Sequence, residues 1–258
     1  MITSTSNAQV KHLVQLKKKA KVRREEQIYV VEGIRMFLEA PQEQIVQTYV
    51  SASFEAEKEH KKYLKGRQYE VLSDTVFSYV SDTKTPQGIL CLVKMPDYTL
   101  EQLLSDEKGM WLILENVQDP GNLGTMFRTG EGAGITGVIM DSSTVDIFNP
   151  KTIRSTMGSI YRIPFYISDD LRETIREIRD RGIRTYAAHL QGSVCYDTAD
   201  YRQGTAFLIG NEGNGLTEAT AALADTYIRI PMCGKLESLN AAMAAGILMY
   251  EANRQRRN

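Results

Sequence analysis

The sequence has few cysteines and no long apolar run, and each shortage excludes a class of protein. Its three cysteines, Cys91, Cys195 and Cys233, lie far apart and form no CxxC pair or Cys/His cluster. That spacing argues against a zinc site and against a disulfide scaffold, so no metal is expected. No apolar run reaches the ~18 residues of a membrane-spanning helix, and no signal peptide opens the chain. The expected location is therefore the cytoplasm.

The chain also lacks a large net charge, which is −1 over 258 residues, so it is not a polycation. The charge is unevenly placed, however, because residues 1–24 contain seven basic residues and no acidic one. Such a cluster can neutralise phosphates even when the net charge is near zero, although a solvated helix face would explain it as well. The predicted RNA contacts in this stretch are Lys11, Lys17, Lys18, Lys19, Arg23 and Arg24.

The first third of the chain is expected to form a small α/β domain at residues 1–95. Residues 4–24 predict a basic helix capped by Ser6 or Asn7. Patterning predicts strands at 28–33, 45–52, 69–72 and 88–93, helices at 34–40 and 74–80, and a charged helical stretch at 55–65. Residues 96–108 are interpreted as a linker.

From residue 109 to 258 the pattern changes to longer apolar strands that alternate with helices. This alternation predicts an α/β domain with a mostly parallel sheet. Strands are expected at 111–117, 137–141, 184–189, 206–210 and 227–230, and helices at 123–132, 150–159, 170–181, 217–224 and 238–256. Asn149 followed by Pro150 marks a helix start, and Gly134 and Gly182 mark helix ends.

One glycine pattern is set aside as a binding site. Gly130, Gly132 and Gly134 fit G-x-G-x-G, but they fall at the end of an expected helix and before a strand. A dinucleotide-binding loop needs the opposite order, strand first and helix second. Close helix packing and a helix C-cap are the expected roles, and the chain contains no phosphate-binding G-x-x-x-x-G-K-[ST] motif.

Three segments, 116–128, 208–216 and 230–240, carry most of the chemical information. Each begins as an apolar run and breaks into glycine and small polar residues, as strands do where an open α/β sheet binds its ligand. Each also has a structural explanation, namely a helix cap at Asn122, a tight turn after Gly210, and a helix cap at Ser238. Arg128 is the only charged residue between Asp119 and Glu131.

Together, the order and spacing of these segments resemble the signature motifs of the SpoU/TrmH-like RNA ribose methyltransferases, a branch of the knotted SPOUT superfamily. The resemblance implies a deep trefoil knot in the C-terminal domain and S-adenosylmethionine as the methyl donor. It implies a catalytic set of Asn122, Arg128, Glu212, Ser238 and Asn240. It also implies a cofactor pocket lined by Leu208, Gly210, Ile230, Met232 and Leu239.

The implied reaction needs help from the protein, because a ribose 2′-hydroxyl is a poor nucleophile at neutral pH. A base, in-line positioning and a nearby cation can each supply some of that help. The histidines, His12, His60 and His189, lie outside the three segments and are expected to be surface or packing residues. Arg128 is favoured as a phosphate clamp and proton-transfer partner, since an arginine stays protonated.

Residues 7–11 and 30–33 resemble, more loosely, the substrate-binding domain that precedes the catalytic domain in many relatives. That domain is similar to the fold of a ribosomal RNA-binding protein. Further candidate phosphate contacts are Lys61, Lys62, Lys65 and Arg67. The stretch 149–159 also resembles the family and could add Arg154 or Ser155 to the site, although an ordinary capped helix explains it too.

The expected function is S-adenosylmethionine-dependent 2′-O-methylation of a structured RNA, with ribosomal RNA favoured over transfer RNA. An antibiotic-resistance methyltransferase would share every motif, and a non-catalytic RNA-binding or ribosome-assembly factor is the alternative outside enzymology. The resemblance also implies a homodimer. The last helix is apolar on more than one side, as a dimer interface would require, at Ala242, Met243, Ile247, Leu248 and Met249.

Overall fold

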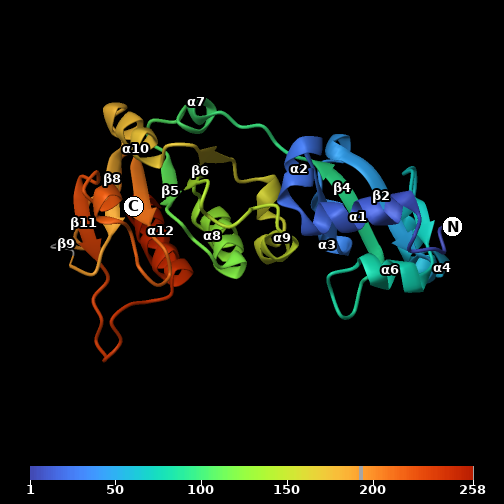
Figure 1. Ribbon diagram of the computed structural model, residues 1–258. Coiled ribbons are helices and arrows are strands. Elements are labelled where there is room, and N and C mark those ends of the chain that lie inside the picture. Colours follow the sequence, from blue (N-terminus) through green and yellow to red (C-terminus); the bar gives the residue numbers. More distant parts are fainter. Residues whose placement is uncertain (192–193, 258) are drawn as a thin grey trace. The chain divides into compact units, whose positions relative to one another are not determined.

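The computed structural model describes residues 1–191 and 194–257, which divide into two compact units (Figure 1). The first unit comprises residues 1–96 and 146–161, and the second comprises residues 97–145 and 162–258. The segment 146–161, which the predicted domain boundaries leave in the C-terminal domain, packs within the first unit. Its Phe148 ring lies 4.8 Å from that of Tyr29, and the Tyr161 hydroxyl donates to the Met36 carbonyl oxygen at 3.0 Å.

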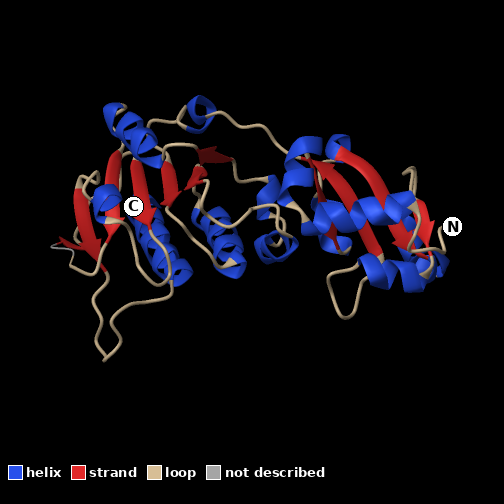
Figure 2. Cartoon of the chain, viewed as in Figure 1, coloured by secondary structure: helices blue, strands red, loops and turns tan. Residues whose placement is uncertain are grey.

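A four-stranded sheet with the order β1–β4–β2–β3 forms the centre of the first unit (Figure 2). Strands β1 (Ile28–Glu32) and β2 (Ile45–Ser51) both pair antiparallel with β4 (Ile89–Lys94), and β3 (Glu70–Leu72) runs parallel to β2. Each strand lies where the sequence predicted one. Short runs of apolar and β-branched residues were therefore a sufficient signal for these strands.

The helices of the first unit cover this sheet. Helix α1 (Ala8–Lys18) is capped by Asn7, as predicted, and buries Val10, Leu13 and Leu16. The basic stretch is not one helix, because extended backbone at Lys19 separates α1 from α2 (Ala20–Glu26). The remaining helices are α3 (Ile34–Glu39), η1 (Gln42–Gln44), α4 (Ala52–Ala56), η2 (Lys58–His60), α5 (Lys61–Leu64), α6 (Asp74–Val80), α9 (Pro150–Thr156) and η3 (Ser159–Tyr161).

The second unit is built on a seven-stranded sheet with the order β7–β6–β5–β10–β8–β11–β9, in which every pair is parallel. The predicted parallel α/β architecture is confirmed. The strands are β5 (Met110–Leu114), β6 (Gly137–Asp141), β7 (Phe165–Ser168), β8 (Arg184–Ala188), β9 (Val194–Cys195), β10 (Thr205–Ile209) and β11 (Thr226–Arg229). Strands β7 and β9 lie at the two edges and were not predicted.

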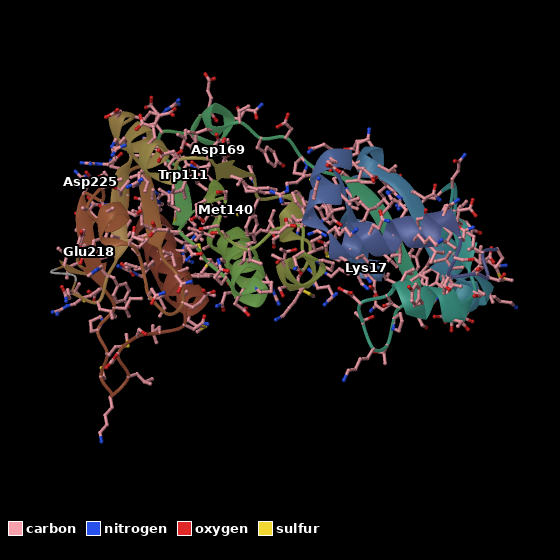
Figure 3. The ribbon with its side chains drawn as sticks, viewed as in Figure 1. Lys17, Trp111, Met140, Asp169, Glu218 and Asp225 are labelled. Atoms are coloured by element: carbon pink, nitrogen blue, oxygen red, sulfur yellow. The ribbon has the colours of Figure 1, made fainter. Side chains whose placement is uncertain are left out.

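The helices of this unit are α7 (Leu100–Leu103), α8 (Pro120–Ala133), α10 (Leu171–Asp180), α11 (Glu218–Ala221) and α12 (Ala241–Arg257). The segment interpreted as a linker contains α7, which a Thr99/Gln102 capping box begins. Leu103 and Leu104 are buried in the same core as Trp111, whose indole N–H donates to the Leu103 carbonyl at 3.0 Å (Figure 3). The stretch 96–108 is therefore partly a packed element of the second unit.

Helices α8 and α12 pack against each other, and small residues allow the close approach. A Cβ on Gly130 would lie 3.5 Å from Met249 Sδ of α12 and 2.4 Å from Ile135 Cδ1, and one on Gly132 would lie 2.9 Å from the Tyr250 hydroxyl of α12. Gly134 ends α8 with a φ of +80°. The G-x-G-x-G pattern thus serves helix packing and a C-cap, as predicted. No helix within the described residues is both long and apolar enough to span a membrane.

Candidate active site

The three segments singled out in the sequence meet at the carboxyl end of the parallel sheet. Strands β5 and β10 are hydrogen-bonded neighbours with Leu114 opposite Ile209, so their carboxyl ends lie side by side. The loops that follow them begin at Glu115 and Gly210, and the loop after β11 begins at Ile230. Parallel strands therefore deliver all three loops to the same crevice.

A chain of hydrogen bonds joins one residue from each segment. The Asn240 side-chain amide donates to Asn122 Oδ1 at 3.0 Å, and the Asn122 amide donates to Glu212 Oε1 at 3.0 Å. These residues are separated by 118 and 90 positions in the sequence. Three of the five predicted catalytic residues thus form a single connected group, which we call the Asn–Asn–Glu chain.

Glu212 anchors this chain to the backbone before α8. Its carboxylate also accepts the backbone N–H of Gln118 and of Asp119, each at 3.0 Å. Burial would raise the pKa of the Glu212 carboxyl, but the hydrogen bonds from Asn122, Gln118 and Asp119 outweigh it and hold this pKa below its ordinary value. Glu212 is therefore ionised, and its hydrogen bonds connect the loop after β10 to the segment that begins α8.

Two helix caps differ from the predicted ones. Asp119 caps α8 by accepting the Asn122 backbone N–H at 2.8 Å, so the Asn122 side chain is available for the Asn–Asn–Glu chain. Asn240 caps α12, because its Oδ1 accepts the N–H of Ala242 at 3.0 Å and of Met243 at 3.2 Å. Ser238, the predicted cap, is instead exposed on the preceding loop and lines the adjacent pocket.

Arg128 lies on α8, six residues beyond Asn122, which corresponds to about 9 Å along the helix axis. Its side chain is exposed, and within residues 1–191 and 194–257 it forms no ion pair. Glu131, three residues further along α8, forms an ion pair with Arg162. An arginine without an internal acidic partner suits an external anion such as a phosphate.

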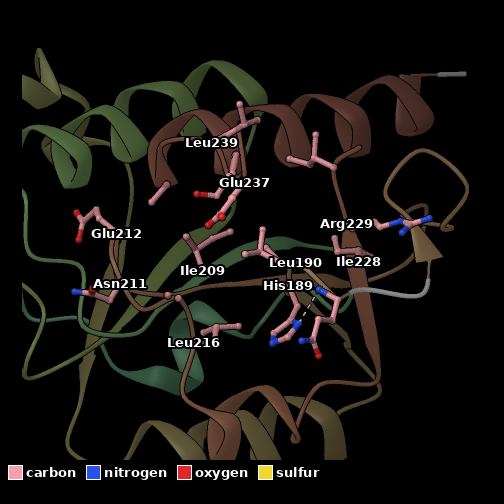
Figure 4. A pocket seen from close by; sticks show the side chains of 18 of the residues that line it. His189, Leu190, Ile209, Asn211, Glu212, Leu216, Ile228, Arg229, Glu237 and Leu239 are labelled. Atoms are coloured by element: carbon pink, nitrogen blue, oxygen red, sulfur yellow. Dashed lines mark hydrogen bonds between the residues drawn. The ribbon is translucent and has the colours of Figure 1, made fainter. Parts of the chain in front are cut away.

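A pocket of about 690 Å³ lies against these loops (Figure 4). Its lining includes four of the five predicted cofactor residues, Gly210, Ile230, Met232 and Leu239. Further apolar walls come from Ile209, Leu216, Ile228 and Leu248. The volume and the apolar lining are typical of a small-molecule site.

Leu208, the fifth predicted cofactor residue, does not line this pocket. It is fully buried in the core of the second unit, and Ile209 lines the pocket instead. Successive side chains of a strand point to opposite faces, so only one of these two neighbours can face the pocket. The prediction chose the wrong neighbour.

Gly210 allows the loop after β10 to fold back on itself. A Cβ at this position would lie 2.1 Å from the Gly215 carbonyl carbon and 2.2 Å from the Leu216 nitrogen. Asn211 and Gly215 exchange two backbone hydrogen bonds, of 3.0 and 2.9 Å, which close the loop. Only glycine permits this backbone contact.

Besides β10 and β11, a third strand contributes to the pocket, and the sequence interpretation missed it. Ala188 ends β8, and His189, Leu190 and Gln191 follow it into the lining (Figure 4). His189 Nδ1 accepts the Gln191 N–H at 3.2 Å, so a neutral His189 carries its proton on Nε2. The His189 ring also tilts against Tyr227 at 5.1 Å. The strand-end rule used for the other loops would have found this histidine.

The predicted RNA contacts in the first unit separate into exposed and buried residues. Lys11, Lys18, Lys19 and Arg24 are exposed. Lys17 has a side chain only 8% exposed, pairs with Asp82 at 3.1 Å and donates to the Val80 carbonyl (Figure 3). The prediction that Lys17 contacts phosphate is therefore wrong, because its ammonium group is already desolvated and paired.

Arg23 is a second correction. Its side chain is 4% exposed, and its guanidinium donates to the Leu16 and Lys17 carbonyls at 2.5 and 3.1 Å and to the Asp146 carboxylate. This arginine holds the α1–α2 turn instead of facing RNA. Arg154 pairs with Asp82 at 3.3 Å and the Ser155 hydroxyl donates to the Lys151 carbonyl at 2.9 Å, and both lie in the first unit.

Comparison with known proteins agrees with these observations. The sequence matches the SpoU rRNA Methylase family over residues 109–250 and the MRM3-like substrate binding domain over residues 7–91. It is 39% identical over 185 residues to the 23S rRNA (guanosine(2553)-2′-O)-methyltransferase RlmP of Bacillus subtilis, an alignment that covers 72% of each chain.

Two solved structures resemble the whole chain. An AdoMet-bound rRNA methyltransferase from Sinorhizobium meliloti has a TM-score of 0.86 and 32% identity, covering 98% of this chain and 97% of that one. The SpoU methyltransferase AviRb from Streptomyces viridochromogenes, in complex with AdoMet, has a TM-score of 0.89 and 26% identity, covering 98% and 99%. The likeness therefore extends across both units.

Proposed function

The chain belongs to the SpoU rRNA methylase family, and from that premise we propose that it transfers a methyl group from S-adenosylmethionine to a ribose 2′-hydroxyl of ribosomal RNA. The observation that carries the proposal is the Asn–Asn–Glu chain beside a pocket of cofactor size. That chain joins the three segments whose motifs define the resemblance. Because the Bacillus subtilis and Sinorhizobium meliloti relatives are named as rRNA methyltransferases, we place the reaction in the cytoplasm.

We further propose that the two regions of the sequence have different roles. Residues 1–95 bind the RNA, and residues 109–258 bind the cofactor and catalyse methyl transfer. The two family matches, which cover residues 7–91 and 109–250, support this assignment. We also propose that the loops at 210–216 and 230–240 form the trefoil knot of this superfamily.

The pocket suits S-adenosylmethionine, which supplies an electrophilic methyl group on a sulfonium sulfur. Ile209, Ile230 and Leu239 provide apolar walls for an adenine ring. Gly210 allows the loop after β10 to fold tightly, so that no side chain at this position stands between the backbone and the ligand. The pocket holds the ligand next to Ser238 and Glu212, which both line it.

The chemistry required of the protein is positioning and proton removal. The 2′-oxygen forms its bond to the methyl carbon as the carbon–sulfur bond breaks and the sulfur keeps that electron pair, while the hydroxyl proton leaves for a base. Arg128 stays protonated and clamps the adjacent phosphate, so that a phosphate oxygen can accept the hydroxyl proton. Its fixed positive charge favours the oxyanion character that develops on the ribose.

The Asn–Asn–Glu chain positions the loops around that reaction. Asn122 uses its amide to donate to Glu212 and its carbonyl to accept from Asn240, so it is a positioning residue. Asn240 uses its carbonyl to cap α12 and keeps one amide hydrogen beyond the bond to Asn122. We propose that Asn240 and Ser238 present their polar groups to the substrates.

We propose that two copies of the chain associate through α12. Met243 is 60% exposed and Tyr250 49% exposed on this helix, whereas Ala242, Leu248 and Met249, which the sequence also suggested, are buried within the chain itself. Exposed large apolar side chains on one helix are typical of a helical dimer contact. Sedimentation of Met243→Lys against wild type measures the expected shift toward monomer.

The first experiment is calorimetric titration of the purified protein with S-adenosylmethionine, followed by methyl transfer to an unmodified 23S rRNA transcript. Arg128→Lys separates the two roles of that arginine. We expect this variant to retain cofactor and RNA binding and to lose turnover by on the order of 10²-fold. Weakened RNA binding with near-normal turnover at saturating RNA would show that Arg128 only clamps phosphate.

The substrate itself is tested by mapping 2′-O-methyl groups in a deletion strain. Loss of one methyl group from ribosomal RNA supports the proposal, and loss from transfer RNA instead would contradict it. A protein that binds the transcript but not the cofactor would be a non-catalytic RNA-binding or ribosome-assembly factor.

A further inference from the structure

Helix α12 runs from one end of the parallel sheet to the other, and side-chain hydrogen bonds hold it at both ends. It packs against α8 and β10 (Figure 1). It begins at the carboxyl end of the sheet, where Asn240 caps it and donates to Asn122. Its last turn lies roughly 22 Å from Ala241, at about 1.5 Å per residue, and therefore far from the site.

Arg256 attaches the last turn of α12 to the backbone of two other segments. Its half-buried guanidinium donates to the Tyr201 carbonyl at 2.8 Å and to the Gln203 carbonyl at 2.6 Å, in the segment before β10. It also donates to the Lys108 carbonyl at 3.0 Å and to the Gly109 carbonyl at 3.1 Å, in the segment before β5. One side chain thus joins α12 to the amino ends of two neighbouring strands.

Two nearby side chains of α12 add bonds of the same kind. Gln255 Oε1 accepts the Tyr201 N–H at 2.9 Å, and the Gln255 amide donates to the Ala199 carbonyl at 2.9 Å. The Asn253 amide donates at 3.0 Å to the carbonyl of Ala133, the last residue of α8. We call the three side chains the α12 clasp, which consists of Asn253, Gln255 and Arg256.

The buried face of α12 consists largely of small side chains. A Cβ on Gly246 would lie 3.3 Å from Thr129 of α8. The buried residues of the helix are Ala242, Ala245, Leu248, Met249 and Ala252. Small side chains interdigitate less than large ones, so this packing discriminates weakly between positions of the helix along its axis. Four hydrogen bonds from one guanidinium, by contrast, fit a single position.

We propose that the α12 clasp fixes the position of α12 along its axis and thereby holds Asn240 and the adjoining pocket wall in place for the cofactor. The inference rests on the proposed function, because it concerns the same pocket. A helix displaced along its axis would withdraw Asn240 from Asn122 and move the wall with it. The residues of α12 that form this wall are Ala241, Ala244 and Leu248.

Arg256 is accordingly a positioning residue, which acts on the cofactor without touching it. When the clasp is weakened, α12 also occupies displaced positions, and only the docked fraction of the protein binds S-adenosylmethionine. The apparent dissociation constant then rises by the inverse of that fraction. Bound cofactor restores the docked position, so turnover at saturating cofactor stays close to that of the wild type.

The experiment compares Arg256→Lys with Arg254→Lys in the full chain. Both variants keep the positive charge, but a lysine cannot reproduce the four bonds of the Arg256 guanidinium. Arg254 is exposed and pairs with Glu251 of its own helix at 2.7 Å, so it is the matched control. Calorimetry measures the affinity for S-adenosylmethionine, and methyl transfer at saturating RNA gives the KM for the cofactor and kcat.

We expect Arg256→Lys to bind S-adenosylmethionine on the order of tenfold more weakly, with a KM for the cofactor raised by the same factor. Its kcat should stay within about twofold of the wild type, and Arg254→Lys should match the wild type throughout. Urea denaturation shows that both variants are folded under the assay conditions. A clasp that served stability alone would lower the urea midpoint and leave the cofactor affinity of the folded protein unchanged.

Hydrogen exchange at the opposite end of α12 provides a second readout, which needs no cofactor. The N–H groups of Ala242 and Met243 donate to Asn240 Oδ1, so release of Asn240 from Asn122 frees this cap to fray. These amides should exchange on the order of tenfold faster in Arg256→Lys, and saturating S-adenosylmethionine should restore the wild-type rate. Unchanged exchange together with unchanged cofactor affinity would overturn the proposal.

The outcomes separate this inference from the proposed function. A wild type that does not bind S-adenosylmethionine would overturn the proposed function, whereas the exchange experiment would still show whether Arg256 controls the start of α12. If Arg256→Lys does not fold, Gln255→Ala tests the same clasp by a smaller change, and the same weakening of cofactor binding is expected. Wild-type affinity and exchange in that variant would contradict the role of the clasp.

Discussion

In the second unit the polar side chains of the site extend from loops at strand ends, whereas in the first unit the candidate RNA contacts lie on helix surfaces. A parallel sheet forces its loops together, so Asn122, Glu212 and Asn240 meet although 118 and 90 residues separate them. A helix surface applies no such constraint. Lys17 is buried and paired while Lys18, the next residue, is exposed.

The two regions therefore differ in how directly their sequence indicates function. A strand that ends in glycine and amides can also be explained by a tight turn or a helix cap, but its position at the carboxyl end of the parallel sheet is fixed by topology. A lysine on a helix can serve the fold as easily as a ligand, and only the tertiary partner decides which.

The largest expected effect tests whether the strand-end loops depend on backbone geometry. Gly210→Ala places a Cβ about 2.1 Å from the Gly215 backbone, so the loop must open. We expect S-adenosylmethionine affinity to fall by roughly 100-fold or more, measured by calorimetry. Gly213→Ala is the matched control, because its Cβ would meet nothing closer than Asn211 Oδ1 at 3.5 Å. Both variants are checked for folding by circular dichroism. Equal S-adenosylmethionine binding by the two would show that the backbone contact at Gly210 does not determine the affinity.

A smaller effect separates the two adjacent lysines. Lys17→Ala leaves the Val80 carbonyl without its donor and Asp82 without one of its two cations. We expect the free energy of unfolding to fall by about 1–3 kcal/mol, measured by chemical denaturation. Lys18→Ala should change stability by less than about 0.5 kcal/mol and weaken only RNA binding. A Lys17→Ala protein of unchanged stability and weakened RNA binding would show that Lys17 contacts RNA.

The smallest effect concerns how the Glu212 carboxylate changes stability with pH. Because its pKa is held below the ordinary value, the Glu212 carboxylate contributes stability above its unfolded pKa of about 4.5 and loses that contribution as the pH falls through the folded pKa. Solvent screening limits the contribution to about 1 kcal/mol or less, since Glu212 is exposed. Glu212→Gln should therefore flatten the dependence of unfolding free energy on pH below about 4.5. An unchanged pH profile would show that the hydrogen bonds from Gln118, Asp119 and Asn122 do not favour the charged form.

Much of the fold followed from periodicity. The predicted strands of both sheets exist, as does the parallel order of the larger one. Strand β7 was missed because four residues at a sheet edge carry too short a pattern, and β9 because it has only two. The break between α1 and α2 was missed because nothing in the local sequence forbids helix at Lys19.

The site was predicted to the level of the loop and less well to the level of the residue. Leu208 and Ile209 are both apolar and both in a strand buried on each face, so hydrophobicity cannot tell which one faces the pocket. Asp119 and Asn122 can each cap a helix, and only the structure shows which does. Lys17 and Arg23 could not be recognised as buried, because their partners Asp82 and Asp146 lie far along the chain.

The bond between Asn240 and Asn122 also has a consequence for how the protein folds. These two residues are 118 positions apart, and the pocket takes part of its wall from Leu239, Ala241, Ala244 and Leu248. Contacts between residues so distant in the sequence form late, because a long loop must close first. The pocket is therefore completed after the local elements have formed, and a ligand that binds in it stabilises the docked position of α12.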